Sequence, residues 1–460
     1  MMISFRGYDE LIDKVRSHGQ EHVFAHWDAL SGDERKALLD DLATVDFEHL
    51  GNLFDAAGKP AAVEAGFQPA PFISLPGTDA ERREFGKARE AGEQHIRRGK
   101  TAAFVVAGGQ GTRLGYDGPK GMFAIGPVSG KSLFQVHAEK ILKSSRKYGV
   151  AIPWLVMTSR ANHAATVEFL ARHGNFGIDE RDLFVFSQNM IPSLDLRGKL
   201  ILETKNSIFK NPDGHGGSLT ALRTSGALEE LARRGIETIS YFQVDNPLVK
   251  IIDPVFIGFH ELRGADVSSK GLPKTGPGEK IGVFAQYDGG RLGVVEYSDL
   301  PEEKARETGT DGRLRFLMGS PAIHLFRRSF VEEITSGGAI ELPFHVARKN
   351  IAAYAAGGSR EIEGFKFEKF VFDAIPLTAK SIVLEMEREE EFAPVKNPSG
   401  VDSAESARRM MSDQALRWLK ARGVPVPDAV KTVEISPLVA VESDDLEGIT
   451  IPAREKVYLE

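Results

Sequence analysis

The segment from Val105 to Phe123, VVAGGQGTRLGYDGPKGMF, combines three kinds of residue that bind phosphate groups: glycines, a hydroxyl and two cations. These residues are Gly108, Gly109, Gly111, Thr112, Arg113 and Lys120. Glycines let backbone N–H groups approach an anion closely, because they carry no Cβ and adopt positive φ at little cost. The hydroxyl adds a donor, and the two cations suit the charge that develops on a transferring phosphoryl group. The segment therefore predicts a phosphate cradle.

Other interpretations of the glycines fit the sequence less well. The spacing of Gly109, Gly111 and Gly115 approximates a dinucleotide fingerprint, but no acidic ribose-binding residue ends a second strand about 20 residues later. The segment Gly126–Ser132 (GPVSGKS) approximates a Walker A loop, but Ile125 stands where that motif requires glycine. An NAD(P)-dependent enzyme and a P-loop NTPase are therefore disfavoured. A plain surface turn is a third alternative, and it would not need two cations and a threonine.

The elements that must position this loop alternate between strands and helices. Ala102–Val106 (AAFVV) is an apolar run typical of a buried strand, and the glycine loop begins at its end. Further strands are expected at Trp154–Thr158, Leu183–Phe186 and Thr238–Val244, and helices at Ser132–Ser145, Asn162–His173 and Ser218–Arg233. This alternation predicts right-handed βαβ units and an α/β fold with a mostly parallel sheet covered on both faces.

The two ends of the chain differ from this centre. Helical periodicity runs through residues 8–91, whereas a helix at Ala404–Arg422 is followed by short strand-like pieces, Gly448–Ile451 among them. We therefore expect a helical N-terminal cap over residues 1–98, a catalytic nucleotide- and sugar-binding domain over 99–395, and a small mixed α/β C-terminal domain over 396–460.

Composition excludes several classes of protein. The 460 residues are 42% hydrophobic and 27% charged, as in ordinary globular proteins, and the net charge of −7 comes with no basic stripe for nucleic acid. The absence of cysteine excludes disulfides, thiolate catalysis and zinc–thiolate sites. The first residues carry charges and no apolar signal segment, and no apolar run of roughly 18 residues occurs. We expect a cytoplasmic protein that partners with neither nucleic acid nor membranes.

The glycine loop also has a family resemblance. The string AGGQGTRLG followed by PKGMF resembles the signature of the eukaryotic-type UDP-sugar pyrophosphorylases, in particular the UDP-N-acetylglucosamine pyrophosphorylase branch. Further matching segments occur in order along nearly the whole chain: GQEHVFAHW, KSLFQVHAEKI, PWLVMTS, PDGHGG, VDNPLVK, GVVEYSDL, DGRLRF, EKFVFD and EISPL. The resemblance implies a Rossmann-like sheet of the GT-A nucleotidyltransferase type. It also implies a uridylyltransferase that joins UTP to a sugar 1-phosphate, such as N-acetylglucosamine 1-phosphate or glucose 1-phosphate, and releases pyrophosphate.

Such a reaction brings two anions together in line, so the site needs positive charge and backbone donors more than a nucleophilic side chain. By resemblance, the three glycines and Thr112 belong to the nucleotide cradle. Arg113 and Lys120 match positions that stabilise the transition-state phosphates. Gln188 and Gly214 match positions that recognise uracil, where an amide and a backbone group pair with the imide edge of the base.

The resemblance also assigns groups to the metal and the sugar. Asp245 follows the expected strand Thr238–Val244, and a carboxylate at such an edge can hold Mg²⁺; the alternative is a turn-forming aspartate. Glu296 matches a residue that hydrogen-bonds sugar hydroxyls, although it could also be an exposed strand residue. Lys369 and Lys396 match positions that contact phosphates, and we place Lys396 with catalysis and Lys369 on the sugar side.

The sugar-binding half departs from the pattern of the branch. His215 stands where the branch usually has asparagine, and Ser320 and Ile323 replace two further asparagines. Serine keeps a smaller polar group than asparagine and isoleucine keeps none, so we expect weaker selection for an acetamido group. A non-catalytic protein that binds nucleotide sugars stays open as an alternative. Retention of Arg113, Lys120 and Asp245 favours an active enzyme.

Overall fold

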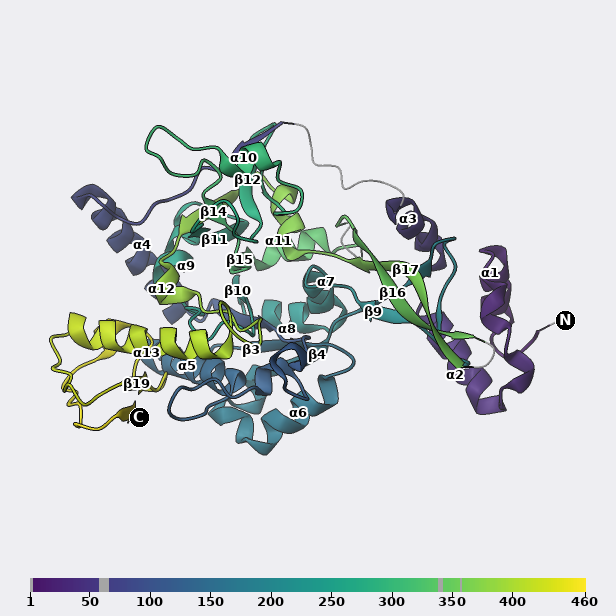
Figure 1. Cartoon of the computed structure of the whole chain (residues 1–460), viewed down its shortest axis with the longest axis horizontal. Coiled ribbons are helices and arrows are strands. Elements are labelled where there is room, and N and C mark those ends of the chain that lie inside the picture. Colours follow the sequence, from purple (N-terminus) through teal and green to yellow (C-terminus); the bar gives the residue numbers. More distant parts are fainter. Residues whose placement is uncertain (1–2, 58–65, 338–341, 356–357) are drawn as a thin grey trace. The chain divides into compact units, whose positions relative to one another are not determined.

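The computed structural model describes residues 3–57, 66–337, 342–355 and 358–460 (Figure 1). By compactness the chain divides into two units, each built from separated segments. The first unit comprises Met1–Val63, Asn189–Gly217 and Glu341–Phe370, and the second comprises Glu64–Gln188, Ser218–Ile340 and Val371–Glu460. The expected domain boundaries at residues 98 and 395 stay a prediction.

The second unit is built on one large sheet. Its strands are β1 (Phe67–Pro69), β2 (Thr101–Val106), β3 (Trp154–Thr158), β4 (Leu183–Ser187), β10 (Thr238–Gln243), β11 (Val267–Pro273), β12 (Val283–Tyr287), β13 (Leu292–Val295), β14 (Met318–Gly319), β15 (His324–Arg327) and β18 (Ser381–Glu385). They lie in the order β1-β12-β14-β11-β15-β10-β2-β3-β4, with β13 beside β12 and β18 beside β11.

This sheet is mixed, whereas the strand–helix alternation predicts a mostly parallel one. Strands β10, β2, β3 and β4 run parallel to one another, as expected. Strand β15, however, lies antiparallel between β10 and β11, and β12 pairs antiparallel with β13. The difference arises after β11, where the chain joins its strands by hairpins and loops instead of by crossover helices, which parallel neighbours require.

Helices cover the sheet of the second unit. They are α4 (Asp79–Arg97), α5 (Leu133–Tyr148), α6 (His163–Arg172), α8 (Ala227–Arg233), α9 (Pro254–Leu262), α10 (Glu302–Arg306), α11 (Arg328–Ile334), α12 (Arg388–Glu391) and α13 (Ala404–Ala421). The expected helix over residues 218–233 is interrupted: α7 (Gly217–Thr224) ends before Gly226, whose φ of +78° stops the helix. Helices α4 and α9 pack so closely that a Cβ at Gly92 would lie 1.8 Å from the Pro254 carbonyl oxygen, so only glycine fits at this position.

Local signals explain why the parallel strands and their helices form where they do. Strands β2 and β3 are apolar and almost fully buried, which is typical of central strands covered on both faces. Helix α5 begins after Ser132, whose hydroxyl accepts a hydrogen bond from the Gln135 N–H, and it ends at Gly149, with φ of +69°. Helix α4 begins with a capping box formed by Thr78 and Glu81.

The first unit combines N-terminal helices with small antiparallel sheets. Its helices are α1 (Asp9–Ser17), α2 (Gly32–Ala43) and α3 (Phe47–Ala57), and its strands are β5 (Met190–Pro192), β6 (Leu194–Asp195), β7 (Leu202–Thr204), β8 (Ser207–Ile208), β9 (Lys210–Pro212), β16 (His345–Ala355) and β17 (Gly358–Glu368). Its core includes Trp27, Leu38, Phe47, Leu194 and Phe367, so residues far apart in the sequence are buried together.

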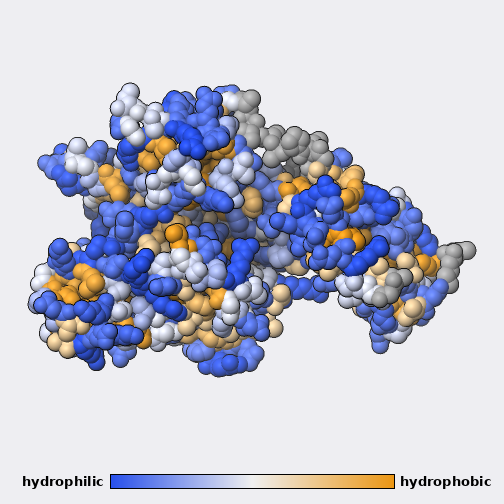
Figure 2. Space-filling model, viewed as in Figure 1, coloured by the Kyte–Doolittle hydropathy of each residue, from blue (hydrophilic) through white to orange (hydrophobic). Residues whose placement is uncertain are grey.

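The C-terminal segment folds around its own small core within the second unit. Helix α13 packs on β19 (Thr432–Ile435), which pairs in parallel with β20 (Lys456–Leu459), whereas the strand expected at Gly448–Ile451 does not form. The face in Figure 2 is largely hydrophilic, with apolar residues in small groups. Among the helices that the structure describes, none is long and apolar enough to cross a membrane.

Candidate active site

Four parallel strands bring the phosphate loop and its neighbours to one edge of the sheet. Val106 of β2 pairs with Gln243 of β10, so the glycine loop and Asp245 both follow directly from the carboxyl ends of adjacent strands. Strand β3 lies on the other side of β2, and Gln188 follows β4, the next strand along. Ligands of open α/β sheets bind at this edge, so the candidate site lies here.

The glycine loop is held in shape by its own backbone and by close packing. The Lys120 N–H donates to the Gly109 carbonyl at 3.0 Å, and the Gly111 N–H donates to the Gly118 carbonyl at 2.8 Å. A Cβ at Gly121 would lie 2.3 Å from the Phe134 ring, so only glycine fits beside Lys120. The loop therefore presents Lys120 from a backbone that cannot shift freely.

The loop also depends on a residue that the sequence reasoning missed. Asn162 is 1% exposed, and its side chain donates to the carbonyl oxygen of Ala107 at 2.9 Å. Its Oδ1 accepts the N–H of Ser159 at 2.8 Å, so one amide joins the loops that follow β2 and β3. Asn162 lies far from the glycine motif in the sequence, and no local pattern there indicates its role.

The two charged groups assigned to phosphate and metal lie together. Lys120 Nζ is 3.3 Å from Asp245 Oδ2, and the two side chains are 18% and 11% exposed. The other Asp245 oxygen has no hydrogen-bond partner among the described residues. A cation and a carboxylate with an unoccupied oxygen thus adjoin the glycine loop, an arrangement suited to phosphates and a hard metal ion.

Lys396 joins this pair. It lines a small cavity together with Asp245, Ile323 and Phe392. The backbone connects them as well, because the Val395 N–H donates to the Asp245 carbonyl at 2.9 Å. Asp245, the expected metal ligand, therefore lies beside two of the expected catalytic residues, Lys120 and Lys396.

Arg113 and Thr112 lie in the short turn that follows the glycines. Both side chains are exposed, and the Arg113 guanidinium makes no hydrogen bond or ion pair with the residues that the structure describes. A free guanidinium beside an anion-binding loop can bind a phosphate without first breaking an internal contact.

Buried side chains from α5 and the loop after β10 hold Asp245 in place. His137 Nε2 bonds the Val244 carbonyl at 2.9 Å, and burial lowers the pKa of His137 to about 3, so the neutral ring donates this bond. Asn246 donates to the Glu391 carbonyl at 2.7 Å and accepts the Ala393 N–H at 3.0 Å. The sequence alone indicates neither residue, because both act through contacts with segments far away along the chain.

Gln188 is placed against the cradle. It is 8% exposed, and a Cβ at Gly108 would come within 3.1 Å of Gln188 Oε1. Its backbone N–H donates to the Thr158 carbonyl at 2.8 Å, which joins the ends of β3 and β4. The carboxamide therefore adjoins the first glycine of the loop, where a base could lie beside bound phosphates.

The remaining sugar residues of the second unit form another neighbourhood. The Ser320 N–H donates to the Gly282 carbonyl at 2.8 Å, and a Cβ at Gly282 would lie 3.2 Å from Glu296 Oε1. Ser320 Oγ is buried and has no hydrogen-bond partner among the residues that the structure describes, whereas Ile323 is 4% exposed and packs in the main core. Of the two residues of this unit that stand where the branch has asparagine, Ser320 keeps a polar group and Ile323 presents an apolar surface.

Three of the expected residues belong to the first unit. A Cβ at Gly214 would lie 2.4 Å from the Lys369 carbonyl oxygen, and the φ of +79° at Gly214 also favours glycine. The Gly216 N–H donates to the same oxygen at 2.8 Å, and the His215 ring stacks on Phe370. Gly214, His215 and Lys369 are therefore brought together. Within this loop, burial raises the pKa of Asp213 to about 7, and its Oδ1 meets no hydrogen-bond donor in the described ranges of the chain.

Comparison with known proteins identifies the family of the chain. Residues 78–444 match the family described as UTP–glucose-1-phosphate uridylyltransferase. The chain is 36% identical to UDP-N-acetylglucosamine diphosphorylase 2 of Arabidopsis thaliana, over 96% of this chain and 91% of that protein. It is 32% identical to the UDP-N-acetylglucosamine pyrophosphorylase of Saccharomyces cerevisiae, over 93% of this chain and 94% of that one.

A solved structure is similar over the full length. The uridine diphosphate N-acetylglucosamine pyrophosphorylase of Trypanosoma brucei, crystallised with an inhibitor, superposes with a TM-score of 0.85 at 27% identity, covering 100% of this chain and 99% of that chain. The resemblance first seen in the glycine loop is thus confirmed along the chain. The chain belongs to the UTP–glucose-1-phosphate uridylyltransferase family.

Proposed function

We propose that this enzyme transfers the uridylyl group of UTP to a sugar 1-phosphate at the edge of the sheet formed by β10, β2, β3 and β4. The observation that carries the proposal is the contact of 3.3 Å between Lys120 and Asp245 beside the glycine loop. A binding protein would need the loop alone. A transferase also needs the cation and the carboxylate, because they act on charge that develops only during transfer.

In this reaction a phosphate oxygen of the sugar 1-phosphate attacks the α-phosphorus of UTP, and pyrophosphate leaves with the electrons of the broken P–O bond. Lys120 and the exposed Arg113 stabilise the negative charge on the phosphates, while Lys396, which lies beside Asp245, contacts the phosphates of the substrates. The glycine loop and Thr112 hold the triphosphate by N–H and O–H donors. Gln188 recognises uracil beside the glycine loop. The proposed role of the Gly214 backbone, in the first unit, rests on the family resemblance.

Mg²⁺ is the proposed cofactor, with Asp245 as its protein ligand. Asp245 offers an oxygen without a protein partner, and its other oxygen already lies beside a cationic group. Mg²⁺ commonly takes one or two carboxylates and completes its shell with phosphates and water, so a single aspartate suffices. When bound, the ion would neutralise phosphate charge. We place the reaction in the cytoplasm and the site in a GT-A-type arrangement.

The sugar is proposed to be an N-acetylhexosamine 1-phosphate, with detectable use of glucose 1-phosphate or galactose 1-phosphate. The names of the relatives support the first part. The second part rests on Ser320 and Ile323, since a buried isoleucine supplies no group for an acetamido substituent. By resemblance, Glu296 is proposed to hydrogen-bond the sugar hydroxyls, and His215 of the first unit keeps its proposed sugar-binding role. Loss of one set of hydrogen bonds costs on the order of 1–3 kcal/mol, or roughly ten- to hundredfold in preference.

A substrate panel tests this function. UTP and Mg²⁺ are supplied with N-acetylglucosamine, glucose or galactose 1-phosphate, and pyrophosphate release gives kcat/KM for each. We expect turnover with all three within about a hundredfold. Preference for the N-acetyl sugar above about a thousandfold contradicts the argument from Ser320 and Ile323. Absence of turnover with every sugar contradicts the proposed reaction itself.

A further inference from the structure

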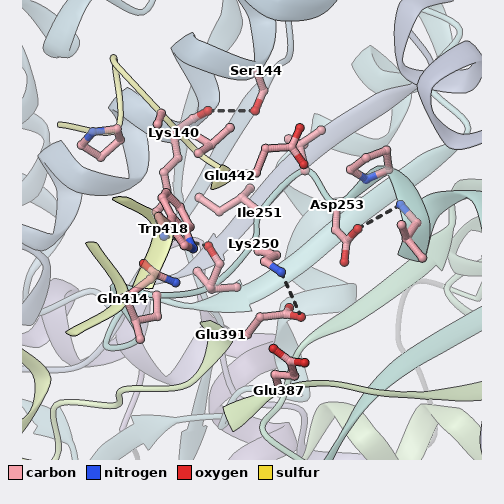
Figure 3. A pocket seen from close by; sticks show the side chains of 18 of the residues that line it. Lys140, Ser144, Lys250, Ile251, Asp253, Glu387, Glu391, Gln414, Trp418 and Glu442 are labelled. Atoms are coloured by element: carbon pink, nitrogen blue, oxygen red, sulfur yellow. Dashed lines mark hydrogen bonds and ion pairs between the residues drawn. The ribbon is translucent and has the colours of Figure 1, made fainter. Parts of the chain in front are cut away.

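A second cavity lies in the same unit as the phosphate loop. Its volume is about 320 Å³, within the range of small-molecule sites, and Figure 3 shows its interior. Helix α13 contributes Met411, Gln414 and Trp418 to the lining, and helix α5 contributes Lys140 and Ser144. Further lining residues come from the loop that follows Asp245, the segment around α12, helix α4, strands β11 and β18, and residues 434–442. The cavity therefore lies between the C-terminal segment and the nucleotide-binding sheet.

The cavity and the active site share a wall. Lys140 Nζ donates to the carbonyl oxygens of Pro247 at 2.5 Å and Val249 at 2.9 Å, which holds the loop that begins with Asp245. Val249 lines both this cavity and the small cavity beside Lys396. A molecule bound here would therefore press on the loop that carries the catalytic carboxylate from the side opposite the substrates.

Most charges that line the cavity already have partners. Lys270 Nζ lies 2.6 Å from Asp253 Oδ2 and 3.0 Å from Glu391 Oε1. Arg89 and Lys147 both pair with Glu442. The cations of the lining thus have little capacity left for an anionic ligand.

Two carboxylates at one end can accept further hydrogen bonds. The Glu391 side chain is 5% exposed and pairs with Lys270 through Oε1, but its Oε2 has no hydrogen-bond partner in the described part of the chain. Glu387 lies at the same end of the cavity in Figure 3, and its carboxylate makes no contact with the described part of the chain. Two cations approach the other oxygen of this side chain: Lys270 Nζ lies 3.0 Å and Lys250 Nζ 3.8 Å from Glu391 Oε1. A buried carboxylate oxygen without a donor is costly, and an added N–H donor would relieve that cost.

Another part of the lining is apolar and includes Leu248, Ile251, Met411, Ala415 and Trp418. An apolar body fits such walls, and one positive group would meet Glu387 and the unpartnered oxygen of Glu391. A carboxylate or phosphate ligand would instead face Glu387 and Glu391 and lose affinity by repulsion.

We propose that this cavity is an effector site for an amphipathic organic cation, that is, an apolar or aromatic body carrying one ammonium group that binds Glu387 and Glu391. A bound cation lowers turnover, because a ligand held between α13 and the loop that begins with Asp245 restrains the adjustment of Asp245 to the bound substrates. The effect on turnover rests on the proposed function, whereas binding of the cation does not.

Binding is measured first, by thermal unfolding of the full chain with 2-phenylethylamine, which is an ammonium at neutral pH. The neutral 2-phenylethanol and the anionic phenylacetate serve as probes of the same shape. We expect a saturable rise in Tm with the amine and at least tenfold weaker binding of both controls. Glu387→Gln removes a carboxylate and Ala415→Leu fills part of the cavity, so each should weaken amine binding about tenfold. Glu405→Gln, at an exposed position of α13, is the control and should leave amine binding unchanged.

Turnover is then followed at saturating amine. We expect kcat to fall at least threefold. The amine concentration that gives half of this fall should equal the concentration that half-saturates binding, and a high concentration of UTP should not restore kcat. Equal binding of the alcohol, or unchanged binding in Glu387→Gln or Ala415→Leu, overturns the assignment of the ligand class or the site. Saturable binding without any change in kcat overturns the coupling to Asp245. An enzyme with no turnover at all refutes the proposed function and leaves the binding result to stand by itself.

Discussion

Replacement of Lys120 should separate the contribution of the Lys120–Asp245 contact to catalysis from its contribution to the stability of the fold. Lys120→Ala removes the cation and leaves an aspartate that is 11% exposed without its partner. Two losses follow. The transition-state phosphates lose a charged donor, and the folded state keeps an uncompensated carboxylate.

The contact distance sets the scale of both losses. At 3.3 Å and an effective dielectric constant of about 20, the gross attraction is about 5 kcal/mol, most of which is offset by desolvation of the two groups. We therefore expect the free energy of unfolding to fall by roughly 1–3 kcal/mol. Loss of a preorganised charged donor should lower kcat/KM by about 10²–10³, or ~2.7–4 kcal/mol of transition-state stabilisation.

A double variant distinguishes the two effects. Asp245→Asn added to Lys120→Ala removes the orphaned charge, so unfolding stability should recover while activity stays low. Pyrophosphate release from UTP and N-acetylglucosamine 1-phosphate gives kcat/KM, and urea unfolding gives stability. Lys120→Arg keeps the charge and should retain more activity than Lys120→Ala. If Lys120→Ala stays within threefold of wild type, or if the double variant regains activity, the role of Lys120 is wrong.

The remaining predictions concern the metal, the base and a buried carboxyl group. Asp245→Asn should fold normally and lose most activity, because an amide is a poor Mg²⁺ ligand; full activity of this variant in EDTA would exclude the metal role. UTP should be preferred over ATP by at least about a hundredfold in kcat/KM, and Gln188→Ala should narrow that ratio; equal use of ATP by the wild type contradicts the uracil assignment. Burial raises the pKa of Asp213 to about 7, so between about pH 4 and 7 the folded chain holds a proton that the unfolded chain has lost. Stability should therefore fall as pH rises through this window, and urea unfolding of Asp213→Asn should show a smaller fall; an unchanged pH profile would refute the assignment.

The parallel part of the sheet and its functional edge could be predicted from the sequence because the signals are local. Ala102–Val106 is a continuous apolar run that is followed by glycines, and such a run predicts a buried strand that leads into a phosphate loop. Asp245 also follows a strand. Since parallel strands end at one edge, their adjacency follows from the topology, and the structure places Asp245 3.3 Å from Lys120.

The rest depends on contacts between distant segments. The antiparallel insertion of β15 between β10 and β11 has no local signature, because a short apolar run pairs equally well in either direction. The bond from Asn162 to the Ala107 carbonyl joins loops from two different strands. Gly214 meets the backbone of Lys369, which lies in another part of the chain. Only the folded chain brings such pairs together.

The fate of the α-phosphorus tests the central claim most directly. UTP labelled at the α-phosphate is incubated with Mg²⁺, N-acetylglucosamine 1-phosphate and the enzyme, and the products are separated. Uridylyl transfer predicts that all the label enters the UDP-sugar, that an equal amount of unlabelled pyrophosphate is released, and that neither product forms without the sugar phosphate. Label recovered in free UMP, or formation of UDP and inorganic phosphate in place of pyrophosphate, would contradict it.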